Sequence, residues 1–189
     1  MMRTINRKNS IEPIRISGPK MEKYIMTIQV LEYVEVKERS LELGCNVPKG
    51  LAFLPINFET VSSKDELVHE DSVLTIRKLW RKAGIEETRI EKEGEKILYE
   101  QRNSLELAIP TVFVSFSLLS QNPGLVSVAL NIISNYATDF FKGIAGEKKV
   151  KFDVIVEQNG KVKSKRIHYE GDIEGLSQLP QVIKELKNL

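Results

Sequence analysis

A long uncharged stretch lies in the middle of the chain: residues 107–138 read LAIPTVFVSFSLLSQNPGLVSVALNIISNYAT, without one Asp, Glu, Lys or Arg. Charged residues make up 29% of the whole chain, so an uncharged run of this length is unusual for its composition. Three interpretations fit: buried core, an interface with a protein partner or a second copy, or contact with a membrane surface. The first half of the stretch is too short to cross a bilayer as a helix. The turn Gln121-Asn122-Pro123-Gly124 separates it from the second half. We therefore expect no bilayer span here.

The second half of this stretch predicts a helix. Asn122 suits the N-cap and Pro123 the first helical position, while Gly143 suits the stop, so the helix should run from Pro123 to Lys142. Its polar residues share one narrow face, and apolar residues cover most of the circumference. A stripe that wide predicts burial on more than one side. The candidate interface residues are Leu125, Val128, Ile132, Tyr136, Phe140 and Phe141.

The first half, residues 107–119, fits two structures. Val112, Val114 and Phe116 alternate with Thr111, Phe113 and further residues, which favours a strand. The length of the segment and Pro110 near its start also fit a buried helix. Periodicity alone leaves strand and helix open.

The end of the chain predicts a β-hairpin followed by a helix. In residues 150–156, Val150, Phe152, Val154 and Val156 alternate with Lys151, Asp153 and Ile155, and Asn159-Gly160 is the strongest short hairpin signal. A two-residue turn would place Phe152 opposite Ile167, Val150 opposite Tyr169 and Asp153 opposite Arg166. Pro180 must lie in the first turn of the last helix, because further inside it would break the helical hydrogen bonds.

The first half of the chain predicts strands and helices in turn. Strands are expected at residues 24–36, 51–58, 87–91 and 96–100, with Pro55 favouring an edge position for the second and Gly94 joining the last two. Ser62 or Ser63 could cap a helix. A clearer helix covers residues 71–83, with Trp80 on its apolar side and Gly84 as the stop.

This order of elements predicts an α+β fold. We expect mainly antiparallel sheets with three helices, including a central very apolar helix, and a C-terminal β-hairpin followed by a helix. We expect residues 1–20 to form a flexible basic arm and residues 21–189 to form a single α+β domain, with a subdivision possible near 100–106.

Composition limits the classes of function. The chain has 28 basic and 26 acidic residues and a net charge of +2, so its overall charge favours neither nucleic acid nor an anionic membrane. A single cysteine, Cys45, excludes an intrachain disulfide and fits a reducing compartment. Residues 1–20 lack the apolar segment of a secretory signal. We therefore expect a cytoplasmic protein.

The residues that carry chemistry do not form a recognisable motif. His69 and His168 have no second histidine or cysteine at metal-ligand spacing, and nothing places either beside Cys45. Between Gly44 and Gly50 the lysine precedes the second glycine, so no phosphate-binding loop is present. We assign no catalytic, cofactor-binding or metal-binding residue and expect no cofactor.

Two basic clusters are candidate phosphate contacts. Arg77, Lys78, Arg81 and Lys82 lie on one arc of the Trp80 helix, and Lys161, Lys163 and Lys165 lie on one face of the hairpin's second strand. The same pattern is also expected without a ligand, because helix faces in contact with water are often basic and lysines on edge strands prevent aggregation. Nucleic-acid binding through these clusters is thus an alternative function.

These observations predict a non-enzymatic accessory or regulatory protein. The expected mode of action is binding to a protein partner or self-association, because the chain lacks a chemical motif but has surplus apolar helix surface. An enzyme whose site assembles only in the folded chain is the remaining alternative.

Overall fold

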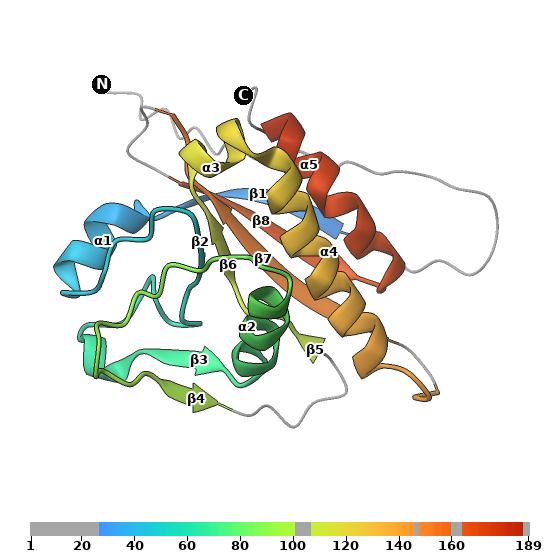
Figure 1. Ribbon diagram of the computed structural model, residues 1–189, viewed down its shortest axis with the longest axis horizontal. Helices are drawn as coiled ribbons and strands as arrows, with labels where there is room; N and C mark the ends of the chain where they lie inside the picture. The colour runs from blue at the N-terminus through green and yellow to red at the C-terminus, as the bar shows by residue number, and fades with distance from the viewer. Residues whose placement is uncertain (1–26, 101–106, 146–147, 160–163, 187–189) are drawn as a thin grey trace, which may run out of the picture.

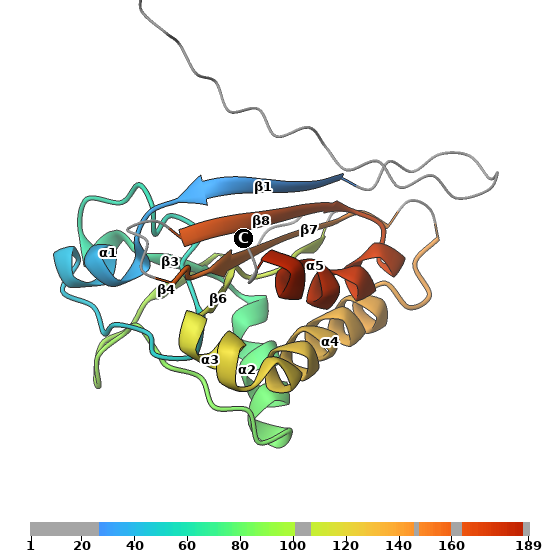
Figure 2. The ribbon, with the colours of Figure 1, turned by 90° about the horizontal axis from the view of Figure 1, so that it is seen from above.

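The computed structural model describes residues 27–100, 107–145, 148–159 and 164–186. One sheet of six strands has most of the helices on one of its faces (Figures 1 and 2). The strands are β1 (Thr27–Tyr33), β2 (Leu51–Phe53), β5 (Leu107–Ala108), β6 (Val112–Val114), β7 (Val150–Val156) and β8 (Ser164–Gly171). A second, two-stranded sheet pairs β3 (Val68–Glu70) with β4 (Leu98–Glu100).

The strand order of the large sheet is β1-β8-β7-β6-β2, with β5 also paired to β7. The β1–β8, β7–β8 and β2–β6 pairs are antiparallel, whereas β5 and β6 run parallel to β7. The predicted α+β class with mostly antiparallel pairing is confirmed at this level.

The described residues contain five α-helices, where the sequence predicts three. These are α1 (Val36–Glu42), α2 (Ser72–Lys82), α3 (Phe116–Gln121), α4 (Pro123–Phe140) and α5 (Leu179–Leu186), with short 3₁₀ turns at η1 (Lys64–Glu66) and η2 (Glu174–Gln178). The predicted helix over 71–83 is present as α2. Pro180 lies in the first turn of α5, as predicted.

Residues 107–119 form a strand first and a helix second. Leu107 pairs with Val150 and Val112 pairs with Val154, so β7 advances four residues while this segment advances five. The extra residue makes a bulge beside Pro110, which has no N–H for the ladder. The Ser115 hydroxyl then accepts a hydrogen bond from the Leu118 amide and caps α3. Each of the two sequence-based alternatives is right for one part of the segment.

The start of α4 agrees with the sequence. The Asn122 side chain accepts a hydrogen bond from the Leu125 amide at 3.1 Å, and Pro123 occupies the first turn. The helix ends at Phe140, two residues before the predicted end, and Gly143 follows with φ 82°.

The predicted register of the C-terminal hairpin is wrong by two residues. Phe152 faces Tyr169, Val150 faces Gly171 and Asp153 faces His168. The last pair among the described residues is Val156 with Lys165. Because a shift of two residues keeps every side chain on its original face, Phe152 and Tyr169 still point to the helices.

The first half of the chain needs four corrections. The strand predicted over residues 51–58 ends at Phe53. The described part of the first predicted strand ends at Tyr33, because Val36 already begins α1. Ser63 caps only the 3₁₀ turn. Residues 87–91 form no strand beyond one bridge between Leu51 and Glu87, and β4 pairs with β3 instead. β2 does lie at a sheet edge, as Pro55 predicts.

Apolar side chains pack on both faces of the sheet. On the helix face, Val154 and Ile167 are fully buried and Phe53 stacks on Trp80 of α2 with ring centroids 4.4 Å apart. On the opposite face, Phe113 and Ile155 pack with residues from α1 and the loops that follow it. In the part of the chain that the structure describes, no helix has the length and apolar character needed to cross a membrane.

Candidate functional site

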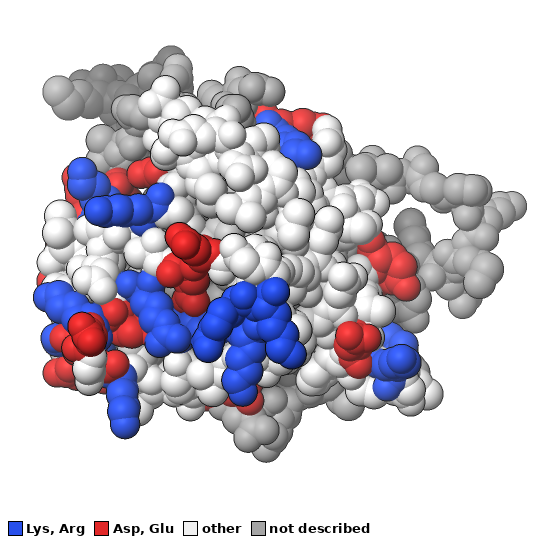
Figure 3. All heavy atoms as spheres, viewed as in Figure 1, with Lys and Arg blue, Asp and Glu red and all other residues white. Residues whose placement is uncertain are grey.

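The outer surface of α3 and α4 carries no charged side chain between Phe116 and Thr138. Figure 3 shows this surface as a continuous uncharged area over the helical layer. We define the α3–α4 face by its exposed and half-buried residues: Leu118, Gln121, Leu125, Val128, Asn131, Ile132, Asn135 and Tyr136. The α4 members lie on one side of the helix at 100° per residue, so they form one surface.

The other side of α4 is core. Val126, Ala129, Leu130, Ile133 and Ala137 are buried against the sheet and the neighbouring helices. The Trp80 indole of α2 donates a hydrogen bond to the Ala129 carbonyl at 3.1 Å, which joins the two helices. With α2 on one side and α5 on the other, α4 is buried on more than one side (Figure 1).

The six sequence-predicted interface residues divide into three groups. Val128 is 48% exposed and Phe140 is 44% exposed. Leu125, Ile132 and Tyr136 are half-buried and contact the core with part of their surface. Phe141 is 2% exposed and belongs to the core, where it meets the Phe140 ring edge-on at 5.0 Å between centroids. Phe141 therefore has no surface to offer a partner.

The described residues of the two predicted basic clusters do not form one surface. Lys78, Arg81 and Lys82 are exposed on α2, where Figure 3 shows a gathering of basic side chains. Lys165 forms an ion pair with Glu32 on β1, while Lys161 and Lys163 lie outside the described residues. Of the predicted phosphate contacts that the structure describes, the exposed ones are therefore Lys78, Arg81 and Lys82, all on α2.

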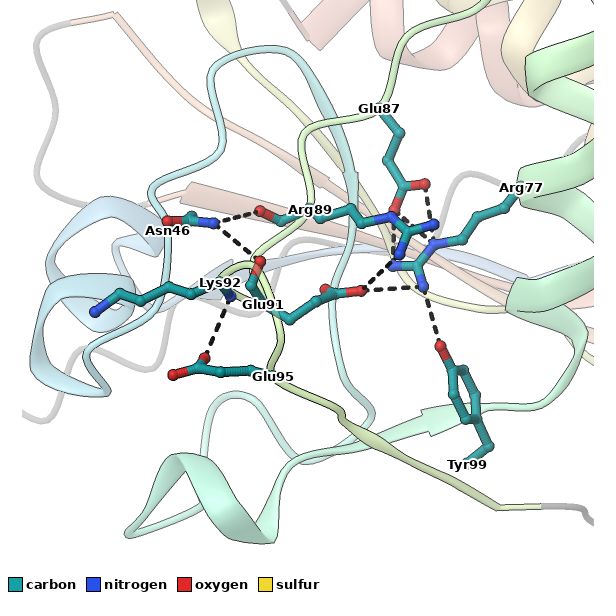
Figure 4. Close-up of polar contacts among 8 residues, drawn as sticks. All are labelled: Asn46, Arg77, Glu87, Arg89, Glu91, Lys92, Glu95 and Tyr99. Carbon is teal, nitrogen blue, oxygen red and sulfur yellow. Dashed lines mark hydrogen bonds and ion pairs between the residues drawn. The ribbon is translucent and has the colours of Figure 1, made fainter.

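Arg77 points into the protein and anchors a buried polar network (Figure 4). Its Nε donates to both carboxylate oxygens of Glu87 at 2.8 and 2.9 Å, and its Nη1 donates to the Tyr99 hydroxyl at 3.1 Å. Glu91 lies 3.2 Å from the same Nη1. The Arg77 side chain is 4% exposed, so its charge is neutralised inside the protein and is not available to an external phosphate.

This network links α2 to the chain segment that follows it. Burial raises the pKa of the Glu87 carboxyl, and the nearby Arg77 charge opposes that effect. The Asn46 side chain holds the same segment by donating to the carbonyls of Arg89 and Glu91. The sequence signal for the burial of Arg77 is its place beside Val73 and Trp80 on the apolar arc of α2; nothing in the sequence identifies Glu87 and Glu91 as its partners.

A cavity of about 330 Å³ lies beside the network. Its wall includes Arg77, Arg81 and Arg89 as well as Glu86 and Glu87, over Trp80 and Ile85. Glu87 already binds Arg77, and no serine, cysteine or histidine lines the cavity. The described wall therefore holds no nucleophile with an adjacent base.

His69 on β3 is completely buried. Neither of its ring nitrogens is hydrogen-bonded to a described residue, and its ring stacks on Tyr99 with centroids 5.9 Å apart. Burial, and to a smaller degree the charge of Arg77, lower the pKa of His69 to about 3. The imidazole is thus neutral at physiological pH.

His168 and Cys45 occupy separate environments. His168 on β8 is half-buried, and its Nδ1 lies 2.6 Å from an Asp153 carboxylate oxygen on β7. Burial raises the pKa of the buried Cys45 thiol, with Glu95 adding to the effect, which disfavours the nucleophilic thiolate. Among the described residues, no three His, Cys, Asp or Glu side chains are grouped as metal ligands.

Comparisons of this chain with protein-family models, curated proteins and solved structures found no match.

Proposed function

We propose that this chain is a non-enzymatic accessory or regulatory protein that acts by binding another protein through the α3–α4 face. One observation carries the proposal: a continuous surface on two adjacent helices lacks charge in a chain of which 29% is charged. The centres of protein interfaces are depleted in charged residues, because desolvating an unpaired charge costs free energy.

The residues of the α3–α4 face define the chemistry of its partner. Val128 offers apolar area, while the Asn131 and Asn135 amides on the same side of α4 can both donate and accept hydrogen bonds. Tyr136 is half-buried and adds an aromatic ring. The matching surface is thus uncharged, with apolar area and hydrogen-bonding groups rather than a row of charges.

Site-specific photocrosslinking in the native cells tests this proposal. A photoreactive phenylalanine analogue is placed in the full chain at Val128 or Asn131, and the matched control is Leu41 on α1, which is 62% exposed. We expect one dominant adduct from both α4 positions and none of that mass from position 41. Equal adducts from all three positions, or none from α4, would contradict the proposal.

Nucleic-acid binding is the second candidate, supported by the exposed Lys78, Arg81 and Lys82 on α2. Titration with DNA and RNA at low and at roughly fourfold higher salt tests it, since binding through phosphates must weaken steeply with salt. Replacing these three cations with glutamine should then abolish binding. Binding that ignores both salt and substitution contradicts this candidate.

A further inference from the structure

The two edges of the large sheet differ. At the β2 edge, the Thr88 amide donates to the Leu51 carbonyl at 2.8 Å, and Leu51 also bridges to Glu87, so a loop covers that edge. At the other edge lies β1, outermost in the sheet in Figure 2. Within the described residues, β8 is the only strand bonded to β1. Alternate residues of β1 therefore direct their N–H and C=O groups away from the sheet.

The described part of β1 lacks three features by which proteins block an exposed edge, namely lysine, proline and a bulge. The strand reads TIQVLEY, with neither lysine nor proline. All seven residues pair one to one with β8, from Thr27 with Glu170 to Tyr33 with Ser164, so β1 has no bulge. Its single charged residue, Glu32, is held by Lys165 of β8. Leu31 is 44% exposed on the same strand. This edge is regular and long enough to accept another strand.

We propose that the β1 edge binds the β1 edge of a second copy of this chain, antiparallel and with Val30 on the two-fold axis. Val30 is the middle of the seven described residues Thr27–Tyr33, so this register pairs all seven of them. Val30 then faces Val30 of the second copy, Gln29 of one copy faces Leu31 of the other, and Ile28 of one copy faces Glu32 of the other. The two sheets become one continuous sheet through main-chain hydrogen bonds.

The charge distribution favours a second copy as the occupant. In this register no charged residue faces a like charge. The two Glu32 side chains are offset by four residues along the strands, about 13 Å, which exceeds the Debye length of about 8 Å at physiological salt. Each Glu32 also keeps Lys165 of its own chain. The strand thus pairs with itself without electrostatic repulsion.

The test is a charge swap at Val30 in the full chain, measured by sedimentation equilibrium. Val30 is half-buried and does not belong to either core cluster, so substitution there should preserve the fold; circular dichroism checks this. The wild-type chain should be a dimer. Val30→Lys and Val30→Glu should each weaken dimerisation by about tenfold or more, because like charges then face each other on the axis. An equimolar mixture of the two variants should restore the dimer.

Two controls separate this proposal from the proposed binding through α4. Val128→Lys should leave the dimer mass unchanged, and Leu41→Lys on α1 should do the same. A monomeric wild-type chain overturns the inference, as would unchanged dimerisation of both Val30 variants. It is also overturned if mixing the folded variants fails to restore the dimer, or if Val128→Lys dissociates it. Each of these results leaves the crosslinking test of α4 to be judged separately.

Discussion

The Arg77 guanidinium on α2 and the Glu87 carboxylate form a buried pair in which Nε lies 2.8 Å from one carboxylate oxygen and 2.9 Å from the other. The two side chains are 4% and 10% exposed. Because removing one partner leaves the other as a largely buried charge, the pair makes the attachment of α2 to the following segment sensitive to single substitutions.

Glu87→Gln should lower the free energy of unfolding by about 2 kcal/mol, because Arg77 would lose a charged acceptor but keep Glu91 and Tyr99. Urea denaturation measures this loss. Glu86→Gln is the matched control, because Glu86 is exposed, and its effect should be within about 0.5 kcal/mol. Equal effects of the two substitutions would mean that the buried pair does not stabilise the fold.

Acid should destabilise the protein through His69. The pKa of His69 is about 3 in the folded chain, against 6.5 for an unperturbed histidine, so between these values the unfolded chain binds a proton that the folded chain does not. Stability is therefore retained above the unperturbed pKa and lost as the pH falls below it. From about pH 7.5 to about pH 4.5 the loss should be about 2–3 kcal/mol from this group.

The His69→Phe variant isolates that contribution. Phenylalanine fills similar space and does not titrate, so the variant should lose about 2–3 kcal/mol less than the wild type over the same pH range. Chemical denaturation at several pH values gives both curves. Parallel curves for the two proteins would show that His69 does not contribute.

Phe140 and Phe141 should respond very differently to substitution. Phe141→Ala should cost about 3–4 kcal/mol, because Phe141 is 2% exposed and a cavity would remain in the core. Phe140→Ala should cost less than about 1 kcal/mol, since that ring is 44% exposed. Thermal and urea unfolding of the two single variants compare them directly. Similar losses would contradict the placement of these rings.

The cap of α4 should be worth about 1 kcal/mol. Asn122→Ala removes the side-chain oxygen that accepts from the Leu125 amide at 3.1 Å. Gln121→Ala serves as the neighbouring control, because its exposed side chain makes one surface hydrogen bond to Ser117. A loss at position 121 as large as that at position 122 would argue against capping by Asn122.

The start of α4 and the inward faces of β7 could be predicted from the sequence alone. Asn122 and Pro123 act within one helical turn, and the period of two along β7 directs Val150, Phe152, Val154 and Val156 to one face whatever the partner strand. These features depend on residues adjacent in the chain, which is why sequence patterns report them.

Tertiary structure alone decided the pairings between distant segments. Phe152 faces Tyr169 rather than Ile167, and alternation could not distinguish the two pairings, because registers that differ by two residues keep every side chain on the same face. Arg77 lies inside because Glu87 and Glu91 come from a segment ten and more residues away and neutralise it there. By itself, the sequence determined which helix carries the uncharged surface. Only the packing of α4 against the sheet, α2 and α5 decided that Phe141 is buried and Val128 is left exposed, since burial depends on neighbours that no local pattern encodes.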